Sequence, residues 1–151
     1  MDIRVDDLQG PDIANFVQEH LQDAAQHSPP ESVHALDIES LRSPDITVWS
    51  MWEDGDLMGC GALRELSPSH GEIKSMRTAP AHRRKGVAAQ MLRHLLQEAN
   101  RRGYERLSLE TGSMAAFAPA RSLYVRFGFQ FCEPFADYVQ DPYSLFMTRK
   151  L

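Results

Sequence analysis

The chain has 151 residues, of which 42% are hydrophobic and 25% are charged, and its formal net charge is -5. This length and composition predict one globular domain over residues 1–151. The acidic balance argues against general nucleic-acid binding, because that mode needs a cationic face to neutralise phosphates. No stretch reaches the ~18 apolar residues of a membrane span, and neither end resembles a targeting signal. We therefore expect a soluble, cytoplasmic protein that binds neither nucleic acid nor membrane.

The cysteines and histidines show no ligand pattern. Cys60 and Cys132 are far apart and form no C-x-x-C pair, and the six histidines lack any H-E-x-x-H spacing. The sequence therefore predicts neither a metal site nor a disulfide. Cys60 lies between Gly59 and Gly61, where glycine indicates a bulge or a close approach by another part of the chain. We expect Cys60 to be a small buried residue.

The first half of the chain predicts a strand, a pair of helices and a hairpin. Helical spacing of apolar residues follows Pro11, and a proline-rich loop separates this helix from a second, shorter one. Two runs rich in β-branched and aromatic residues flank a Glu-Asp-Gly-Asp turn signal, as in an antiparallel hairpin. The expected elements are a strand over 2–7, helices over 11–27 and 32–41, and hairpin strands over 46–52 and 57–66.

The second half predicts a β-α-β unit followed by a helix and two closing strands. A strand, a basic turn, a long helix with one apolar face and another strand follow in order. An acidic and aromatic loop separates the closing strands. The expected elements are strands over 72–78, 104–110, 129–132 and 144–149, and helices over 87–101 and 119–127.

The basic turn has the features of a phosphate cradle. Backbone N–H groups in such a turn point outward, and the N-terminus of the following helix adds partial positive charge. A side chain at Gly86 would block the close approach of a phosphate to the backbone. Taken alone, the same residues could be a solvated helix start. The candidate cradle residues are Arg83, Arg84, Lys85, Gly86, Val87, Ala88 and Ala89.

Two motifs together resemble the GCN5-related N-acetyltransferase superfamily. The first is a strand ending Met76-Arg77-Thr78 followed by Arg83-x-x-Gly86-x-Ala88 at a helix start. The second is Ala120-x-x-x-Tyr124-x-x-Phe127-Gly128-Phe129, and residues 107–112 and 117–129 resemble a bacterial branch of largely uncharacterised acetyltransferases. The resemblance implies an α/β fold with a mostly antiparallel twisted sheet, a β-α-β cofactor unit and helices on both faces.

The resemblance also implies a cofactor site for acetyl-CoA, with no metal. The strand ending at Thr78 and the next strand would splay apart, and main-chain groups of Met76, Arg77 and Thr78 would bind the pantetheine arm. The cradle would bind the pyrophosphate. Two departures stand out: Ala88 lies where relatives often have glycine, and Phe117 lies where many have asparagine.

Acetyl transfer to an amine needs a base, an oxyanion donor and an acid. The resemblance implies Glu72, the main-chain N–H of Met76 and Tyr124 in these roles, with Tyr124 beside the cofactor sulfur. Strand alternation predicts that Glu72, Lys74 and Met76 share one face. The alternatives are that Glu72 is a surface or salt-bridge residue and that Tyr124 only packs in its helix.

We therefore expect an acetyl-CoA-dependent N-acetyltransferase that acts directly on a primary amine. The acceptor, a small molecule or a peptide, would lie between the 28–36 loop and the 135–143 loop. His34 and His70 are candidates for acceptor-site residues, although lone histidines are usually structural or exposed. The alternative is a non-catalytic acyl-CoA-binding or sensing domain. A nucleotide-binding domain is disfavoured, because the chain lacks the G-x-x-x-x-G-K-[ST] pattern. A homodimer is compatible with this fold.

Overall fold

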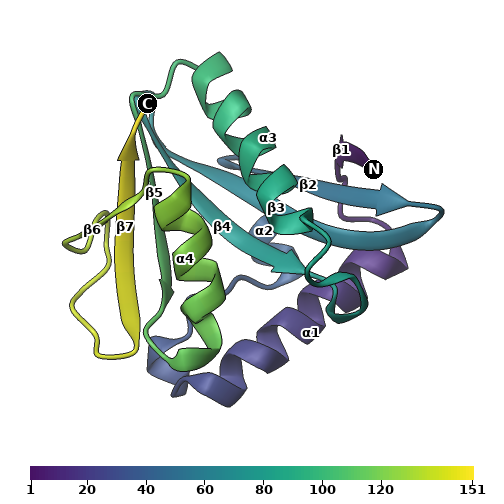
Figure 1. The fold of residues 1–151 in the computed structure, drawn as a ribbon, viewed down its shortest axis with the longest axis horizontal. Coiled ribbons are helices and arrows are strands. Elements are labelled where there is room, and N and C mark those ends of the chain that lie inside the picture. The colour runs from purple at the N-terminus through teal and green to yellow at the C-terminus, as the bar shows by residue number, and fades with distance from the viewer.

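Seven strands form one sheet in the computed structural model, which describes residues 1–151 (Figure 1). Their order is β1-β2-β3-β4-β5-β7-β6, and only β4 and β5 pair in parallel. The strands are β1 (Asp2–Val5), β2 (Ile46–Glu53), β3 (Asp56–Ser67), β4 (His70–Thr78), β5 (Arg106–Gly112), β6 (Gln130–Cys132) and β7 (Ser144–Lys150). The helices are α1 (Pro11–His27), α2 (Ile38–Leu41), α3 (Val87–Arg101) and α4 (Ala118–Arg126).

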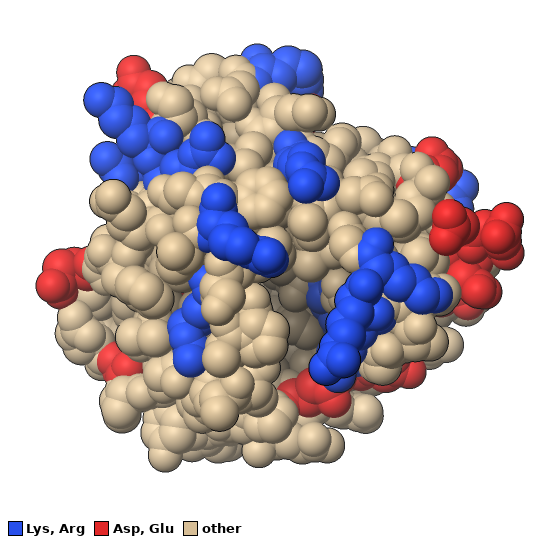
Figure 2. All heavy atoms as spheres, viewed as in Figure 1, with Lys and Arg blue, Asp and Glu red and all other residues tan.

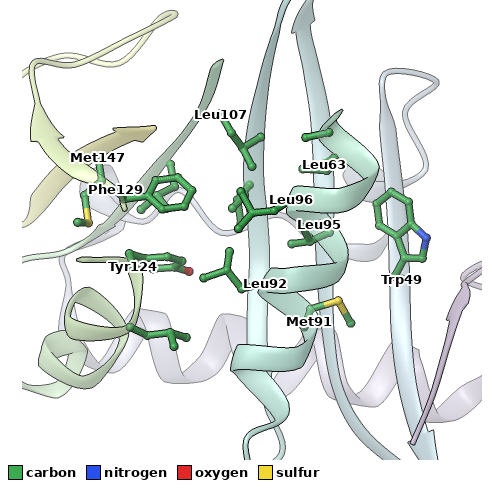
Figure 3. Packing of buried hydrophobic residues seen from close by; sticks show 14 of the residues in the cluster. Trp49, Leu63, Met91, Leu92, Leu95, Leu96, Leu107, Tyr124, Phe129 and Met147 are labelled. Atoms are coloured by element: carbon green, nitrogen blue, oxygen red, sulfur yellow. The ribbon is translucent and has the colours of Figure 1, made fainter. Parts of the chain in front are cut away.

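Helices cover both faces of this sheet, each over its own apolar core. The apolar faces of α3 and α4 pack against one face, around Leu92, Leu95 and Tyr124 (Figure 3). The helices α1 and α2 pack against the other face, around Ile13 and Leu41. The unit β4-α3-β5 is the expected parallel crossover, so the predicted fold class is confirmed. None of the helices is long and apolar enough to cross a bilayer.

Local signals predicted α1, α3 and the β2–β3 hairpin well. Helix α1 begins at Pro11, which suits a first helical turn because its missing N–H would have no partner there. Asp54 and Gly55 link β2 to β3 with φ values of 52° and 81°, so both turn residues are left-handed, as a tight hairpin turn requires.

The predicted helix over 32–41 is largely wrong. The structure has a short 3-10 turn at Pro30–Ser32, and α2 spans only Ile38–Leu41. The Asp37 carboxylate accepts a hydrogen bond from the Ser40 N–H and so begins α2 there. The Ser32 hydroxyl donates to the Asp141 carboxylate at 2.6 Å. This long-range contact holds the segment in a loop that its apolar spacing does not reveal.

Strand β4 contains a bulge that corrects the predicted side-chain pattern. Cys60 pairs with Arg77 and Ala62 with Lys74, so two residues of β4 oppose Gly61 alone. Ser75, within the bulge, has φ 55°. The extra residue inverts the alternation, and Met76 lies on the α3 face whereas Lys74 lies on the opposite face. The prediction that Met76 shares a face with Glu72 and Lys74 is therefore wrong.

Gly59 allows β3 to approach β4 and α3 closely. A Cβ at this position would lie 2.8 Å from the Arg77 carbonyl oxygen and 2.8 Å from Val87 Cγ1. Other parts of the chain thus approach Gly59 and Gly61 closely, as expected from the sequence. Because the carbonyl belongs to a strand paired with β3, and Val87 begins α3, neither can move away without disturbing its element.

We predict that Gly59→Ala lowers the free energy of unfolding by about 1–3 kcal/mol, because it overpacks a filled space. Urea denaturation measures the loss. Gly10→Ala is the control for overpacking, since Gly10 has φ -78° and no atom lies within 4 Å of a Cβ there. Gly10 is the N-cap of α1, so this variant should lose less, only the preference of an N-cap for glycine over alanine. Equal stability of the two variants would contradict the packing argument.

Candidate active site

Strands β4 and β5 pair over only part of their length. The parallel ladder runs from His70 and Arg106 to Ile73 and Leu109 and then ends. Beyond it, 74–78 of β4 and 110–112 of β5 continue without pairing to one another, and we call this region the β4–β5 gap. The bulge at Ser75 lies at its beginning and bends β4. The two strands thus diverge as predicted, and main-chain groups of 76–78 lie along the gap.

The turn before α3 is shaped to receive an anion. Gly86 has φ 80°, Arg84 has φ 64°, and no atom lies within 4 Å of a Cβ built on Gly86. The first hydrogen bond of α3 runs from the Gln90 N–H to the Gly86 carbonyl. The N–H groups of 87–89 therefore have no acceptor in the protein, which leaves an anion-binding helix terminus with open space before it.

The basic side chains of this turn are available to a ligand. Arg83, Arg84 and Lys85 are exposed, and none of them forms a salt bridge. Figure 2 shows Lys and Arg side chains gathered over the β4–α3 loop, whereas Asp and Glu side chains gather at the tip of the β2–β3 hairpin. The cation cluster is thus local within an acidic chain, and it suits a phosphate group.

Arg77 does not contribute its side chain to this turn. Its guanidinium pairs with Asp23 of α1 at 2.5 Å and lies over the Phe16 ring at 5.3 Å. Only the main chain of Arg77 therefore remains for contacts within the β4–β5 gap. The bulge explains this orientation, because it turns Arg77 toward α1.

Tyr124 of α4 lies in the core on the α3 face of the sheet. Its ring packs edge-on against Phe129 at 5.7 Å, and its hydroxyl points toward α3 (Figure 3). The residue is 6% exposed, and its hydroxyl donates no hydrogen bond within the protein. Burial, together with the nearby Glu110 carboxylate, raises the pKa of Tyr124. The hydroxyl is therefore a protonated donor without a partner.

Glu72 is buried in a polar network on the opposite face. Its Oε2 accepts hydrogen bonds from the Tyr138 hydroxyl at 2.6 Å and from Lys74 Nζ at 3.3 Å, and Lys74 Nζ also donates to the Tyr138 hydroxyl at 2.9 Å. The side chains of Glu72 and Lys74 are 1% and 7% exposed. Glu72 Oε1 is buried and has no partner. Glu72 is therefore a salt-bridge residue, but not a surface one.

Sequence reasoning did not single out Glu110. It lies on β5, one residue beyond the last pair with β4, and accepts a hydrogen bond from the Ser144 hydroxyl at 2.7 Å. Burial raises the pKa of Glu110, while the Ser144 hydrogen bond, His34 and Lys74 oppose the shift. Leu107 and Leu109 face the core, and side chains alternate along a strand, so the sequence could have predicted that Glu110 lies on the opposite face of the sheet. We call Glu72, Lys74, Glu110, Tyr138 and Ser144 the polar cluster.

Two loops far apart in sequence meet over the polar cluster. Ser32 bonds to Asp141, and the His34 ring packs edge-on against Tyr138 at 5.0 Å between centroids. The 28–36 and 135–143 loops, between which the acceptor is predicted to lie, therefore contact one another. His70 lies at the paired end of β4, where its Nε2 lies 2.7 Å from Ser108 Oγ. Of the two histidines, only His34 contacts the polar cluster directly.

Neither Cys60 nor Phe117 offers a reactive or polar group to the site. Burial raises the pKa of Cys60 to about 12, and its Sγ donates to the Ser75 carbonyl. Such a thiol is a poor nucleophile near neutral pH. The Phe117 ring occupies the space beside Gly112, where a Cβ would lie 2.3 Å from it, and packs edge-on against His27. It supplies no polar contact in place of an asparagine.

Similar proteins share this fold over the whole chain. A putative acyl-CoA N-acyltransferase structure from Klebsiella pneumoniae has a TM-score of 0.79 and 26% identity, over 99% of this chain and 97% of that one. A GNAT family acetyltransferase from Elizabethkingia anophelis, with acetyl-CoA bound, has a TM-score of 0.67 and 15% identity, over 99% of this chain and 97% of that one. At this low identity, the second likeness concerns the fold alone.

Sequence relatives point to the same group of enzymes. The uncharacterized N-acetyltransferase YsnE of Bacillus subtilis is 63% identical over the full length of both chains. An IAA acetyltransferase of Azospirillum brasilense is 37% identical over 82% of this chain and 80% of its own length. The family model described as acetyltransferase (GNAT) family matches residues 13–129. The chain therefore belongs to the GNAT acetyltransferase family and is an acyltransferase of a largely uncharacterised bacterial branch.

Proposed function

We propose that the protein uses acetyl-CoA and transfers the acetyl group directly to a primary amine, within a single domain over residues 1–151. The observation that carries this proposal is the β4–β5 gap, with the anion-binding turn of α3 beyond the end of β4. Tyr124 lies on the α3 face of the sheet, and Glu72, one residue before the last β4 pair with β5, lies on the other face. A bound acetyl-CoA supplies the thioester from which the acetyl group is transferred.

The residues around the turn fit the phosphates of this co-substrate. The free N–H groups of Val87, Ala88 and Ala89 would bind the pyrophosphate, and Arg83, Arg84 and Lys85 would add opposite charge. The main chain of 76–78 would pair with the pantetheine amides as a strand partner does. The Elizabethkingia anophelis acetyltransferase, which has the same fold and has acetyl-CoA bound, supports this assignment.

Three groups would serve the transfer itself. Glu72 accepts a proton from the acceptor ammonium, directly or through water, because its Oε1 is buried without a partner. The Met76 N–H donates to the carbonyl oxygen of the thioester, a contact typically worth about 3 kcal/mol of barrier. Tyr124 donates its proton to the sulfur as the carbon–sulfur bond breaks, and the carbon–nitrogen bond replaces it.

Titration calorimetry with acetyl-CoA, followed by thiol release across a panel of amines, tests the proposal. We expect binding and amine-dependent thiol release. Binding without release of thiol from any amine would favour a non-catalytic acyl-CoA sensor, whereas no binding to any CoA ester would refute both functions. The relative named for IAA favours a small-molecule acceptor in this panel.

We predict that Gly86→Val weakens acetyl-CoA binding about tenfold or more, since a side chain would occupy the space open to the phosphates. Gly103→Val is a matched control, because Gly103 also has φ 80° with no atom within 4 Å of its Cβ, but lies beyond the other end of α3. Both variants should lose similar stability in thermal denaturation. Equal acetyl-CoA affinities in calorimetry would contradict the phosphate assignment.

A further inference from the structure

The polar cluster contains one more carboxylate than it has cations. Glu72 is paired with Lys74, whereas no Lys, Arg or His nitrogen lies within 4.0 Å of a Glu110 oxygen. Glu110 receives only the Ser144 hydrogen bond. Glu110 is half-buried, and burial raises its pKa. Charges that are partly removed from water are normally paired, and this carboxylate lacks a cation.

Glu72 Oε1 is a buried acceptor without a donor. The side chain is 1% exposed, and Tyr138 and Lys74 both bind the other oxygen, Oε2. Glu72 and Glu110 lie on neighbouring strands and on the same face of the sheet, close enough for the Glu72 charge to raise the Glu110 pKa. The missing partner is therefore a cation with several donors, which is the chemistry of an alkylammonium group.

Glu110 also lies where such a cation would meet the reacting groups. It is the first β5 residue of the β4–β5 gap. Its charge acts on Lys74 and Glu72 on one side, and on the Tyr124 hydroxyl on the other. A nitrogen held by Glu110 would thus lie between the base and the acid of the proposed reaction.

We propose that Glu110 binds the acceptor as an alkylammonium ion, and that the site selects cationic amines without a carboxylate on the amine-bearing carbon. This inference rests on the proposed function. A carboxylate on that carbon would lie against Glu110 and Glu72, which repel it, whereas the basic groups beside them are Lys74 and His34. Glu110 keeps its charge as the counter-ion, while the proton to be removed passes to Glu72 Oε1.

Calorimetry in the presence of saturating CoA tests this site with defined probes. We expect the wild-type protein to bind n-butylammonium at least tenfold more tightly than butan-1-ol or norvaline. Norvaline carries a carboxylate on the amine-bearing carbon, and butan-1-ol is a neutral analogue of similar shape. Absence of n-butylammonium binding, or equal binding of the three probes, would overturn the inference without the use of any variant.

Variants then assign the effect to one side chain. Glu110→Gln should weaken n-butylammonium binding about tenfold or more and leave CoA affinity unchanged, and Glu110→Asp should restore part of the loss. Glu105→Gln, an exposed carboxylate in the same segment, is the control and should bind as the wild type does. Unchanged n-butylammonium affinity in Glu110→Gln would overturn the assignment.

The same measurements separate this inference from the function on which it rests. A protein that binds no CoA ester would refute the proposed function, and this inference with it. A protein that binds acetyl-CoA and releases thiol with amines, but does so with the same KM for amine in wild type and Glu110→Gln, would refute only the role of Glu110. Loss of amine affinity with intact acetyl-CoA affinity supports both.

Discussion

Tyr124→Phe should lower kcat by about 100-fold or more while leaving the fold and acetyl-CoA affinity nearly unchanged. General acids in enzymes typically contribute 10²–10⁴-fold, and the leaving thiolate would lose its proton donor. The phenyl ring keeps the edge-on contact with Phe129 and the burial of the tyrosine. Stopped-time thiol assays with saturating substrates measure the loss.

The loss of kcat in Tyr124→Phe should not depend on pH near neutrality. Burial holds the pKa of Tyr124 above its usual value of about 10. The hydroxyl therefore stays protonated between about pH 6.5 and 9.5, so the Tyr124→Phe deficit should be constant over that range. A deficit that disappears toward alkaline pH would instead indicate a group that titrates there.

Tyr104→Phe is the control for loss of a buried tyrosine hydroxyl. Tyr104 is 4% exposed and donates to Glu65 at 2.9 Å, at the end of β4 opposite the gap. Its replacement should reduce stability and leave kcat unchanged. If Tyr124→Phe behaved in the same way, Tyr124 would be a packing residue and not an acid.

Glu72→Gln should lower kcat/KM about 100-fold or more at pH 7, and the deficit should shrink as the pH rises. An alkylamine with a pKa of about 10.4 is nearly all ammonium at pH 7, so a base must remove a proton. Near pH 10 a large share of the amine is already neutral, so the reaction depends less on a base. A deficit that stays constant from pH 7 to 10 would contradict the role of base.

The ion pair of Glu72 requires a separate control for stability. Glu72→Gln leaves the Lys74 ammonium buried without its carboxylate, and breaking a buried pair in this way costs about 3–5 kcal/mol. Glu72→Gln combined with Lys74→Met removes both charges and should regain most of the unfolding free energy in urea denaturation. Activity should not return with stability, and full recovery of turnover in the double variant would refute the catalytic role.

Some features of the site could be predicted because their causes are local. The helical spacing of α1 and α3 and the hairpin turn depend on residues within a few positions of one another. The turn before α3, which we propose binds the pyrophosphate, depends on Gly86 and on the first turn of α3, which are contiguous in the sequence. These elements agree with their sequence patterns to within one or two residues.

Other predictions failed because their causes lie elsewhere in the chain. The bulge at Ser75 depends on how β3 and β4 align around Gly61, and one extra residue turned Met76 to the α3 face. The loop before α2 is held by Asp141, which is 109 residues from Ser32. Neither the bulge nor the loop can be recognised from the spacing of apolar residues in its own segment.

Short-range patterns in the sequence encode the fold class and the turn before α3 that we propose binds the pyrophosphate. The groups that surround the β4–β5 gap depend instead on tertiary contacts. The Tyr138 hydroxyl reaches Glu72 across 66 residues of sequence, and Ser144 reaches Glu110 across 34. Hydrogen bonds and unpaired charges at such separations have no local signature, since they arise only when β4, β5, β7 and the loop before β7 come together.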